Sequence, residues 1–235
     1  MNAIKVVQCW DDGVVDDIRL IEILRKHRAK ASFNLNFGYF GAVRDEGWNY
    51  RDVKRVSRLA KSEIRDVYEG FLVANHGFTH PHLPQIPIDE AVSCIRQGKD
   101  ALEQHFGYPV TGFAYPFGDY NPEIMEVICE AGHAYARTAD ARSENADGKV
   151  SPQDDPMALH PHCHFLAPDF YERLEQVKAV GGVFYFWGHS YELVVEQDWA
   201  DFDAKICRLN SDPAVEWANL PDVFRIENAG RKCRD

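Results

Sequence analysis

The 235-residue sequence lacks several features that would assign it to other classes of protein. No stretch approaches the ~18 consecutive apolar residues of a membrane-spanning helix. Basic residues are not in excess: 26 Lys and Arg against 37 Asp and Glu give a formal net charge of −11. This balance argues against nucleic acid or an anionic membrane as the main partner. Because no repeat, low-complexity tract or linker divides the chain, we expect one domain over residues 1–235.

The six cysteines are scattered, with neither a C-x-x-C pair nor the spacing of a zinc knuckle. This distribution predicts reduced thiols rather than a disulfide framework. Residues 1–5 lead directly into an apolar stretch and leave no room for a signal peptide. The expected location is therefore the cytoplasm, and the oligomeric state is left open.

Apolar runs alternate with amphipathic stretches along the chain. Short apolar runs predict buried strands, and apolar residues at spacings of three and four predict helices. The predicted strands cover residues 6–10, 30–36, 71–74, 111–115, 133–138, 157–160, 182–187 and 223–226. The predicted helices cover residues 14–24, 51–66, 88–106, 122–131, 167–180 and 199–209. This alternation predicts an α/β protein with a parallel sheet, and seven or eight strands favour a (β/α) barrel similar to a TIM barrel.

In such a barrel the active site lies on the loops that follow the strands. Polar or titratable residues stand at nearly every predicted strand end: Asp11, Asp12, Asn34, Asn36, His76, His80, Tyr115, Arg137, residues 160–164 and His189. Unrelated turns would not place such groups at so many strand ends. We therefore predict one active site at the mouth of the barrel.

The first two motifs suggest a metal site. Adjacent carboxylates at Asp11 and Asp12 repel each other, and a cation would compensate, so that one binds the ion while the other handles protons. His76 and His80 have the i, i+4 spacing that lets two imidazoles point the same way in a helical turn. Two imidazoles and one carboxylate make a three-ligand site for zinc or a similar divalent ion. The alternatives to a metal site are that the Asp-Asp-Gly sequence is a solvated turn and that the two histidines lie on the surface.

Together these residues carry a resemblance to the polysaccharide deacetylases, carbohydrate esterase family four. The matching motifs, in order, are Asp11-Asp12-Gly13, His76 with His80, Tyr115-Pro116-Phe117-Gly118 and Trp187-Gly188-His189. The resemblance covers roughly residues 4–195. It implies a deformed (β/α) barrel and a metal-dependent hydrolase.

The resemblance also implies roles for individual residues. Asp12, His76 and His80 would bind one divalent ion, for which we expect zinc. Asp11 would be the general base and His189 the general acid. The ion and the backbone N–H of Phe117 would hold the oxyanion.

The sequence departs from the family at two places. Many members have an arginine where Ala114 stands, and that arginine steadies the base. Arg137, at the end of the next predicted strand, is the nearest substitute, so we predict that it pairs with Asp11. The alternatives are a surface arginine or one that binds substrate. The tryptophan-bearing fourth motif has no clear counterpart in residues 138–156, so substrate contacts must differ from those of chitin-type members.

Other residues near the predicted mouth have less definite roles. Tyr115, Phe117 and Trp187 could stack on sugar rings, with ordinary core packing as the alternative, favoured for Trp187. His160, His162 and His164 would add substrate contacts or hydrogen bonds behind the site, unless they form only a surface loop that scavenges zinc.

The expected function is removal of an N- or O-acetyl group from a sugar. Without an export signal, the expected substrate is an intracellular precursor in surface polysaccharide biosynthesis. One alternative is a hydrolase of a non-sugar C–N bond, such as a cyclic amide. Another is a catalytically degenerate sugar-binding protein, against which the complete set of acid, base and metal ligands argues.

Overall fold

A computed structural model describes residues 3–140 and 155–223. Its strands are β1 (Ile4–Asp11), β2 (Ser32–Leu35), β3 (Trp48–Tyr50), β4 (Lys54–Val56), β5 (Leu72–Asn75), β6 (Gly112–Ala114), β7 (Tyr135–Arg137), β8 (Cys163–His164), β9 (Gly182–Gly188) and β10 (Val215–Trp217). Its α-helices are α1 (Asp17–Lys26), α2 (Ile64–Val67), α3 (Ile88–Phe106), α4 (Pro122–Glu130), α5 (Phe170–Val180), α6 (Glu196–Ser211) and α7 (Leu220–Val223). Short 3₁₀ turns are η1 (Phe37–Tyr39), η2 (Leu83–Gln85), η3 (Pro116–Gly118) and η5 (Ser190–Glu192).

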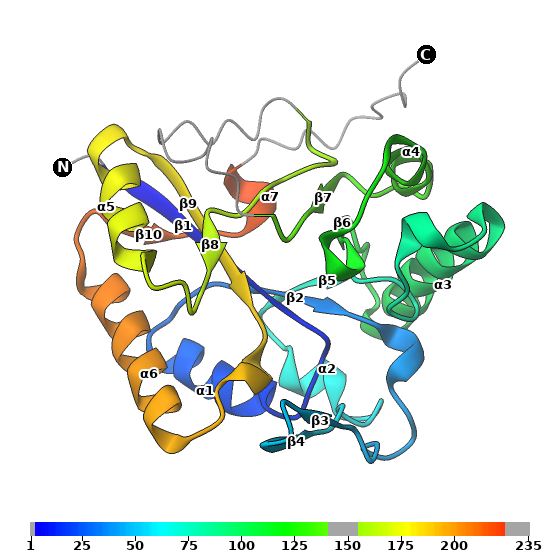
Figure 1. Cartoon of the computed structure of the whole chain (residues 1–235), viewed down its shortest axis with the longest axis horizontal. Coiled ribbons are helices and arrows are strands. Elements are labelled where there is room, and N and C mark those ends of the chain that lie inside the picture. Colours follow the sequence, from blue (N-terminus) through cyan, green and yellow to red (C-terminus); the bar gives the residue numbers. More distant parts are fainter. Residues whose placement is uncertain (1–2, 141–154, 224–235) are drawn as a thin grey trace.

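Eight parallel strands form one curled sheet in the order β7-β6-β5-β2-β1-β9-β8, with β10 also paired to β1. The helices lie around the outside of this sheet (Figure 1). The two ends of the sheet approach each other where Leu159, just before β8, forms a single parallel bridge with Arg137 of β7. The predicted deformed (β/α) barrel of seven or eight parallel strands is therefore confirmed.

Strand β1 is the centre of the structure, as its apolar sequence predicts. Strand β9 pairs with one edge of β1 along almost the whole length of β1. Strands β10 and β2 pair with the other edge of β1, β10 near its beginning and β2 near its end. Trp10 is fully buried and makes edge-to-face contacts with Phe165 and Phe202, at centroid distances of 4.9 and 5.3 Å. Packing on both faces holds β1 rigidly, so the residues at its carboxyl end have a fixed platform.

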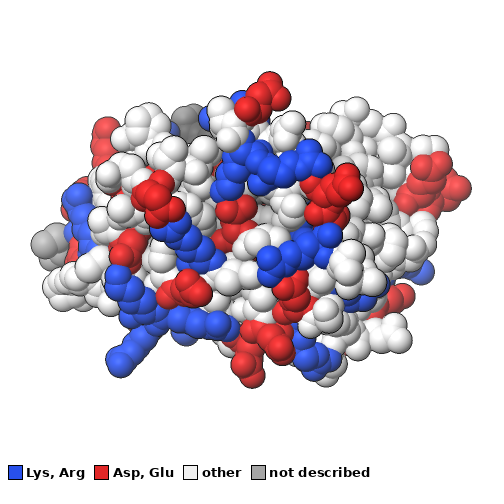
Figure 2. All heavy atoms as spheres, turned by 90° about the horizontal axis from the view of Figure 1, so that it is seen from below, with Lys and Arg blue, Asp and Glu red and all other residues white. Residues whose placement is uncertain are grey.

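The helix predicted over residues 88–106 has the same bounds in the structure. It follows Pro87 and ends at Gly107, whose φ of 81° is the left-handed conformation that glycine adopts most readily. On the outside of the barrel, α1 and α6 are joined by the ion pairs Arg19–Glu196 and Lys26–Asp203. The face in Figure 2 accordingly shows acidic and basic side chains interspersed, without the continuous basic patch typical of nucleic-acid binding.

The helix predicted over residues 51–66 is wrong. Strands β3 and β4 form an antiparallel hairpin there, and only the short α2 follows. The turn of this hairpin contains Arg51 and Asp52, both with positive φ, which stops a helix from beginning. The apolar spacing is also misleading, because Val53 is 66% exposed while Val56 is buried.

Two predicted strands also need correction. Residues 157–160 contribute only the bridge at Leu159, since Pro161 has no N–H to continue a ladder, and β8 forms later. A strand at 223–226 is not supported: Val223 ends α7, and residues 224–226 lie outside the described residues. The strand that completes this part of the sheet is β10. No helix in the described part of the chain is both long and apolar enough to span a membrane.

Candidate active site

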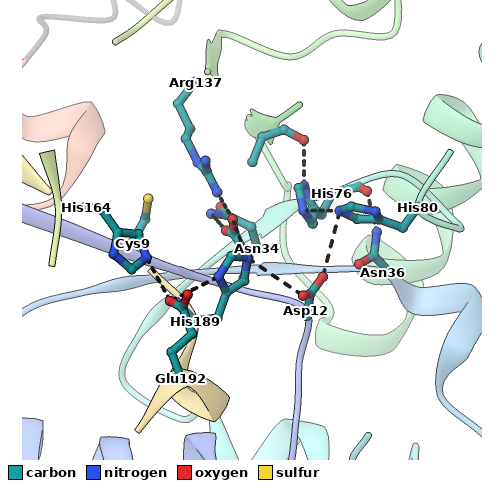
Figure 3. Close-up of polar contacts among 12 residues, drawn as sticks. Cys9, Asp12, Asn34, Asn36, His76, His80, Arg137, His164, His189 and Glu192 are labelled. Atoms are coloured by element: carbon teal, nitrogen blue, oxygen red, sulfur yellow. Dashed lines mark hydrogen bonds and ion pairs between the residues drawn. The ribbon is translucent and has the colours of Figure 1, made fainter. Parts of the chain in front are cut away.

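The strand register brings the predicted site residues to one end of the barrel. Asp11 of β1 lies level with Asn34 of β2, and Ala114 of β6 lies level with Arg137 of β7. The loops after β5 and β9 add His76 and His189 at the same end. Figure 3 shows the side chains of Asn34, His76, Arg137 and His189 converging on a common space.

The Asp-Asp-Gly sequence is both a tight turn and part of the site. Asp12 has a φ of 82°, which is rare for a residue with a side chain, and its N–H donates to the Asn34 carbonyl at 3.1 Å. At Gly13, with a φ of 70°, an added Cβ would lie 2.5 Å from the Phe40 ring. The backbone therefore bends sharply after Asp11, and only glycine fits at position 13. Unusual backbone geometry of this kind is often kept where function requires it.

Asp12, His76 and His80 form a group of three metal-ligating side chains, of which Asp12 and His76 are buried and His80 is partly exposed. His76 Nδ1–H donates to the Ala114 carbonyl at 2.8 Å, which leaves its Nε2 facing Nε2 of His80 at 3.1 Å. His80 Nε2 lies 3.9 Å from Asp12 Oδ1, and one ligand atom from each residue lies within 4.8 Å of the others. One of these nitrogens can donate its N–H to the other, and once that proton is lost both would offer lone pairs to a cation, together with the Asp12 carboxylate oxygen. The donor set therefore fits a divalent ion.

The two histidines meet without the helical turn that their spacing predicts. Gly77 has a φ of 79°, which is incompatible with a right-handed helix, and its N–H donates to the Asn75 side chain at 2.9 Å. The Asn36 amide donates to the carbonyl of His76 and, at 3.2 Å, to that of Thr79. Asparagines at two strand ends therefore hold this loop in place of helical hydrogen bonds.

Burial keeps both imidazoles neutral. Burial, with a smaller effect of the neighbouring His76, lowers the pKa of His80 to about 4. Burial also lowers the pKa of His76, although the charges of Asp11 and Asp12 oppose that effect. A metal binds the neutral form of imidazole, so both histidines are prepared as ligands at neutral pH.

Asp11 is held as a carboxylate by its neighbours. The Arg137 guanidinium forms a buried ion pair with Oδ2, and the Asn34 amide donates to Oδ1 at 2.6 Å. Burial alone would raise the pKa of Asp11, but the charge of Arg137, with smaller effects of the nearby His76 and His189, outweighs it and holds the pKa well below its usual range. The ion pair that the departure at Ala114 predicts is therefore present.

His189 lies beside both aspartates. Its Nε2 is 4.0 Å from Asp11 Oδ2 and 3.9 Å from Asp12 Oδ2. Its Nδ1 lies 3.3 Å from Oε2 of Glu192, and His164 Nε2 lies 2.7 Å from the same oxygen. Burial opposes protonation of His189, but the hydrogen bond with Glu192 and the charges of both aspartates raise its pKa.

Sequence analysis missed two residues of this site, Glu192 and Tyr191. Glu192 stands three residues after His189, and the 3₁₀ turn η5 returns its carboxylate to the histidine. Tyr191 stacks on His189, with a centroid distance of 4.8 Å and an interplanar angle of 27°. The i, i+3 spacing of His189 and Glu192 is the sequence signal that could have revealed this contact. It indicates a contact only when the residues are known to form a helical turn.

The aromatic residues of the site divide between core and surface. Tyr115 is buried, and its hydroxyl donates to the Met157 carbonyl at 2.8 Å, so it packs in the core. Phe117 is 53% exposed and stacks on His82 at a centroid distance of 3.7 Å. Trp187 is partly buried and lies between the guanidinium of Arg137, 5.1 Å away, and the His189 ring, 5.3 Å away. Of these three rings, that of Phe117 is the one that is largely exposed.

The histidines of the 160–164 segment also have separate environments. His160 Nδ1 lies 2.7 Å from the Thr138 hydroxyl. His162 is buried, and its Nδ1 accepts from the Tyr185 N–H at 3.0 Å. Burial lowers the pKa of His162 to about 4, so it serves as a neutral acceptor between segments. Of these three, His164 is the one joined to His189 through Glu192.

The chain belongs to the polysaccharide deacetylase family, whose profile matches residues 1–136. It is 34% identical over 70 residues to the peptidoglycan-N-acetylmuramic acid deacetylase PdaC of Bacillus subtilis, covering 30% of this chain and 15% of that protein. It is 27% identical over 134 residues to the chitooligosaccharide deacetylase of Azorhizobium caulinodans, covering 56% of each. The matched segments thus span 15% and 56% of these two relatives.

The fold is similar to that of a family 4 carbohydrate esterase from Streptomyces lividans, solved in complex with acetate. The TM-score is 0.58, with 18% identity and 91% of each chain covered. At this identity the likeness shows the fold alone. The deformed (β/α) barrel is thus common to the two proteins, while the chemistry of this chain must be argued from its own residues.

Proposed function

We propose that this protein is a metal-dependent hydrolase that removes the acetyl group from an N-acetylated sugar. The observation that carries the proposal is the placement of a base and an acid, Asp11 and His189, beside the three-ligand group of Asp12, His76 and His80. The names of the two relatives support the substrate class, since one is a chitooligosaccharide deacetylase and the other a peptidoglycan deacetylase. An O-acetyl ester is a second substrate that the same arrangement could hydrolyse.

Asp12, His76 and His80 would hold the ion, and two nitrogens with one carboxylate oxygen suit zinc in a catalytic site that keeps an open position. When bound, the ion polarises the acetyl carbonyl and lowers the pKa of a water. Asp11, kept ionised by Arg137, takes a proton from the attacking water. The backbone N–H of Phe117, at the exposed mouth, is proposed as a donor to the oxyanion of the tetrahedral intermediate.

His189 is proposed as the acid that protonates the departing amine nitrogen. Glu192 holds its Nδ1, so that Nε2 faces the reaction space beside Asp11 and Asp12. A carboxylate behind the imidazole fixes the tautomer and stabilises the protonated ring. Arg137 lowers the pKa of the base and Glu192 raises the pKa of the acid, and these are the directions that acid–base catalysis requires.

We further propose that the substrate is a precursor in surface polysaccharide biosynthesis and that the protein acts in the cytoplasm. The free thiols of the five described cysteines support a reducing location. Hydrolysis of a cyclic amide remains the second enzymatic candidate, because the same base, acid and metal ligands would act on any accessible C–N bond.

The test is acetate release by the zinc-loaded protein from a panel of substrates. The panel contains N-acetylated chitooligosaccharides, peptidoglycan fragments, acetylated nucleotide sugars and O-acetylated sugars, with cyclic amides as the comparison class. We expect acetate from at least one N-acetylated sugar and none after metal removal. Hydrolysis of cyclic amides alone would overturn the proposal, and so would sugar binding without any acetate release.

A further inference from the structure

A second group of metal-ligating side chains lies beside the proposed active site. It consists of His164, from β8, and of His189 and Glu192, which follow β9. One ligand atom from each lies within 4.8 Å of the others. Figure 3 shows this group on the opposite side of the site from Asp12, His76 and His80.

The geometry of this second group fits a divalent cation. His164 Nε2 and His189 Nδ1 lie 2.7 and 3.3 Å from the same carboxylate oxygen of Glu192. Ligands at about 2.1 Å from a tetrahedral zinc ion are about 3.4 Å apart, so small side-chain shifts complete the site. The three side chains are 25%, 19% and 13% exposed respectively, which leaves the group open to ions from solution.

The surroundings can also accept a second positive charge. Asp12 of the first ligand group and the neighbouring Asp11 lie 3.9 and 4.0 Å from His189 Nε2, on the side of the ring away from Glu192. Glu192 itself is a carboxylate, because its hydrogen bonds with His164 and His189 overcome the effect of burial and lower its pKa to about 2. Asp12 and Glu192 therefore each offer a carboxylate to one of the two cations, while Asp11 is paired with Arg137.

We propose that His164, His189 and Glu192 form a second divalent-cation site, and that a cation bound there inhibits the enzyme. The cation would take the Nδ1 lone pair of His189 and release that nitrogen's proton to solvent. His189 would then keep only its Nε2 proton and could not act as a cationic acid. The site itself does not depend on the proposed function, but the inhibition rests on the acid role of His189.

The test of the site is metal stoichiometry, which does not require activity. The full chain is stripped with a chelator and dialysed against increasing zinc, and Co²⁺ absorption spectra provide a second measurement. We expect two equivalents in the wild type, one tight and one weaker. His164→Gln and Glu192→Gln should each keep the tight equivalent and lose the weaker one. The retained tight equivalent shows that these variants fold.

Two further variants complete the design. Asp12→Ala combined with His80→Ala should keep only the weaker equivalent. His27→Gln is the matched control, since His27 pairs with Asp203 on the outside of the barrel and should leave both equivalents in place. If the wild type binds only one equivalent of zinc at concentrations up to millimolar, the second site does not exist. A second equivalent of zinc that is still bound by both His164→Gln and Glu192→Gln would also refute the site.

Inhibition is measured as acetate release at increasing zinc, with each variant compared with its own maximum. We expect wild-type activity to fall as the second equivalent binds, and the midpoint to move to at least about tenfold higher zinc in His164→Gln. A second equivalent that binds without inhibition would refute the inhibitory step and the acid role of His189 together. If no substrate is hydrolysed at one equivalent, the proposed function fails, while the stoichiometry still decides the site.

Discussion

Arg137 forms a buried ion pair with Asp11, although 126 residues separate them in the chain. Ala114 of β6, which has no charged side chain, lies level with Arg137 of β7, and the Arg137 guanidinium lies 5.1 Å from the Trp187 ring. A guanidinium on the next strand thus occupies the place beside the base that the alanine leaves open. The departure from the family pattern at Ala114 and the ion pair of Arg137 are therefore linked.

Removing the charge of Arg137 should change the pH dependence of the enzyme. In Arg137→Met, burial would raise the pKa of Asp11, so the base would be protonated at higher pH. The acidic limb of the pH–rate profile should move upward, by roughly 1–3 pH units, and turnover should fall while metal content stays the same. Arg137→Lys, which keeps the charge, should move the limb less. An unchanged limb in Arg137→Met would show that Arg137 does not keep Asp11 ionised.

Metal binding should depend on His80 and not on its neighbour His82. His80→Ala should purify folded but metal-poor and inactive, because only two of three ligands remain. His82→Ala is the control, since His82 pairs with Asp119 and lies outside the ligand group. Metal content, measured by atomic emission after dialysis, distinguishes the two. Tightly held stoichiometric metal in His80→Ala would remove His80 from the ligand set.

The acid role of His189 should depend on the leaving group. His189→Ala should keep the metal of the first site but lose about 10²–10⁴-fold in turnover on an N-acetyl substrate, because the amine must leave protonated. The loss should be far smaller on an acetyl ester with a good leaving group, which departs without a proton. Turnover on both substrates, measured with the same preparation, gives the comparison. Equal losses would indicate that His189 has a structural role.

Glu192 should set the basic limb of the pH–rate profile. Its hydrogen bond raises the pKa of His189, so Glu192→Gln should lower that pKa and deprotonate the acid at lower pH. The basic limb should therefore move downward, with the acidic limb in place. Tyr50→Phe is the control, because the Tyr50 hydroxyl contacts Glu192 only at 3.5 Å and leaves its charge intact. A basic limb that stays in place in Glu192→Gln would contradict the pairing.

The sequence by itself determines the elements and residues whose signals are local. The helix of residues 88–106 has its apolar spacing and a terminal glycine within one stretch, and the strand over 182–187 is one apolar run. Asp11, Asp12, His76 and His80 stand out for the same reason, because turn chemistry and ligand spacing are properties of neighbouring residues. The ion pair of Arg137 could be predicted only because a family pattern showed what was missing at Ala114.

Tertiary structure alone decided the contacts between distant segments. The hairpin of β3 and β4 replaced a predicted helix because backbone turns at Arg51 and Asp52 outweigh apolar spacing. Tyr115 and Phe117, two residues apart, were separated into core and surface by the left-handed φ of 59° at Phe117. Glu192 became the partner of both His164 and His189 because η5, which follows β9, turns its carboxylate back toward the two histidines. Such pairings depend on packing across the sheet, which no local pattern of residues encodes.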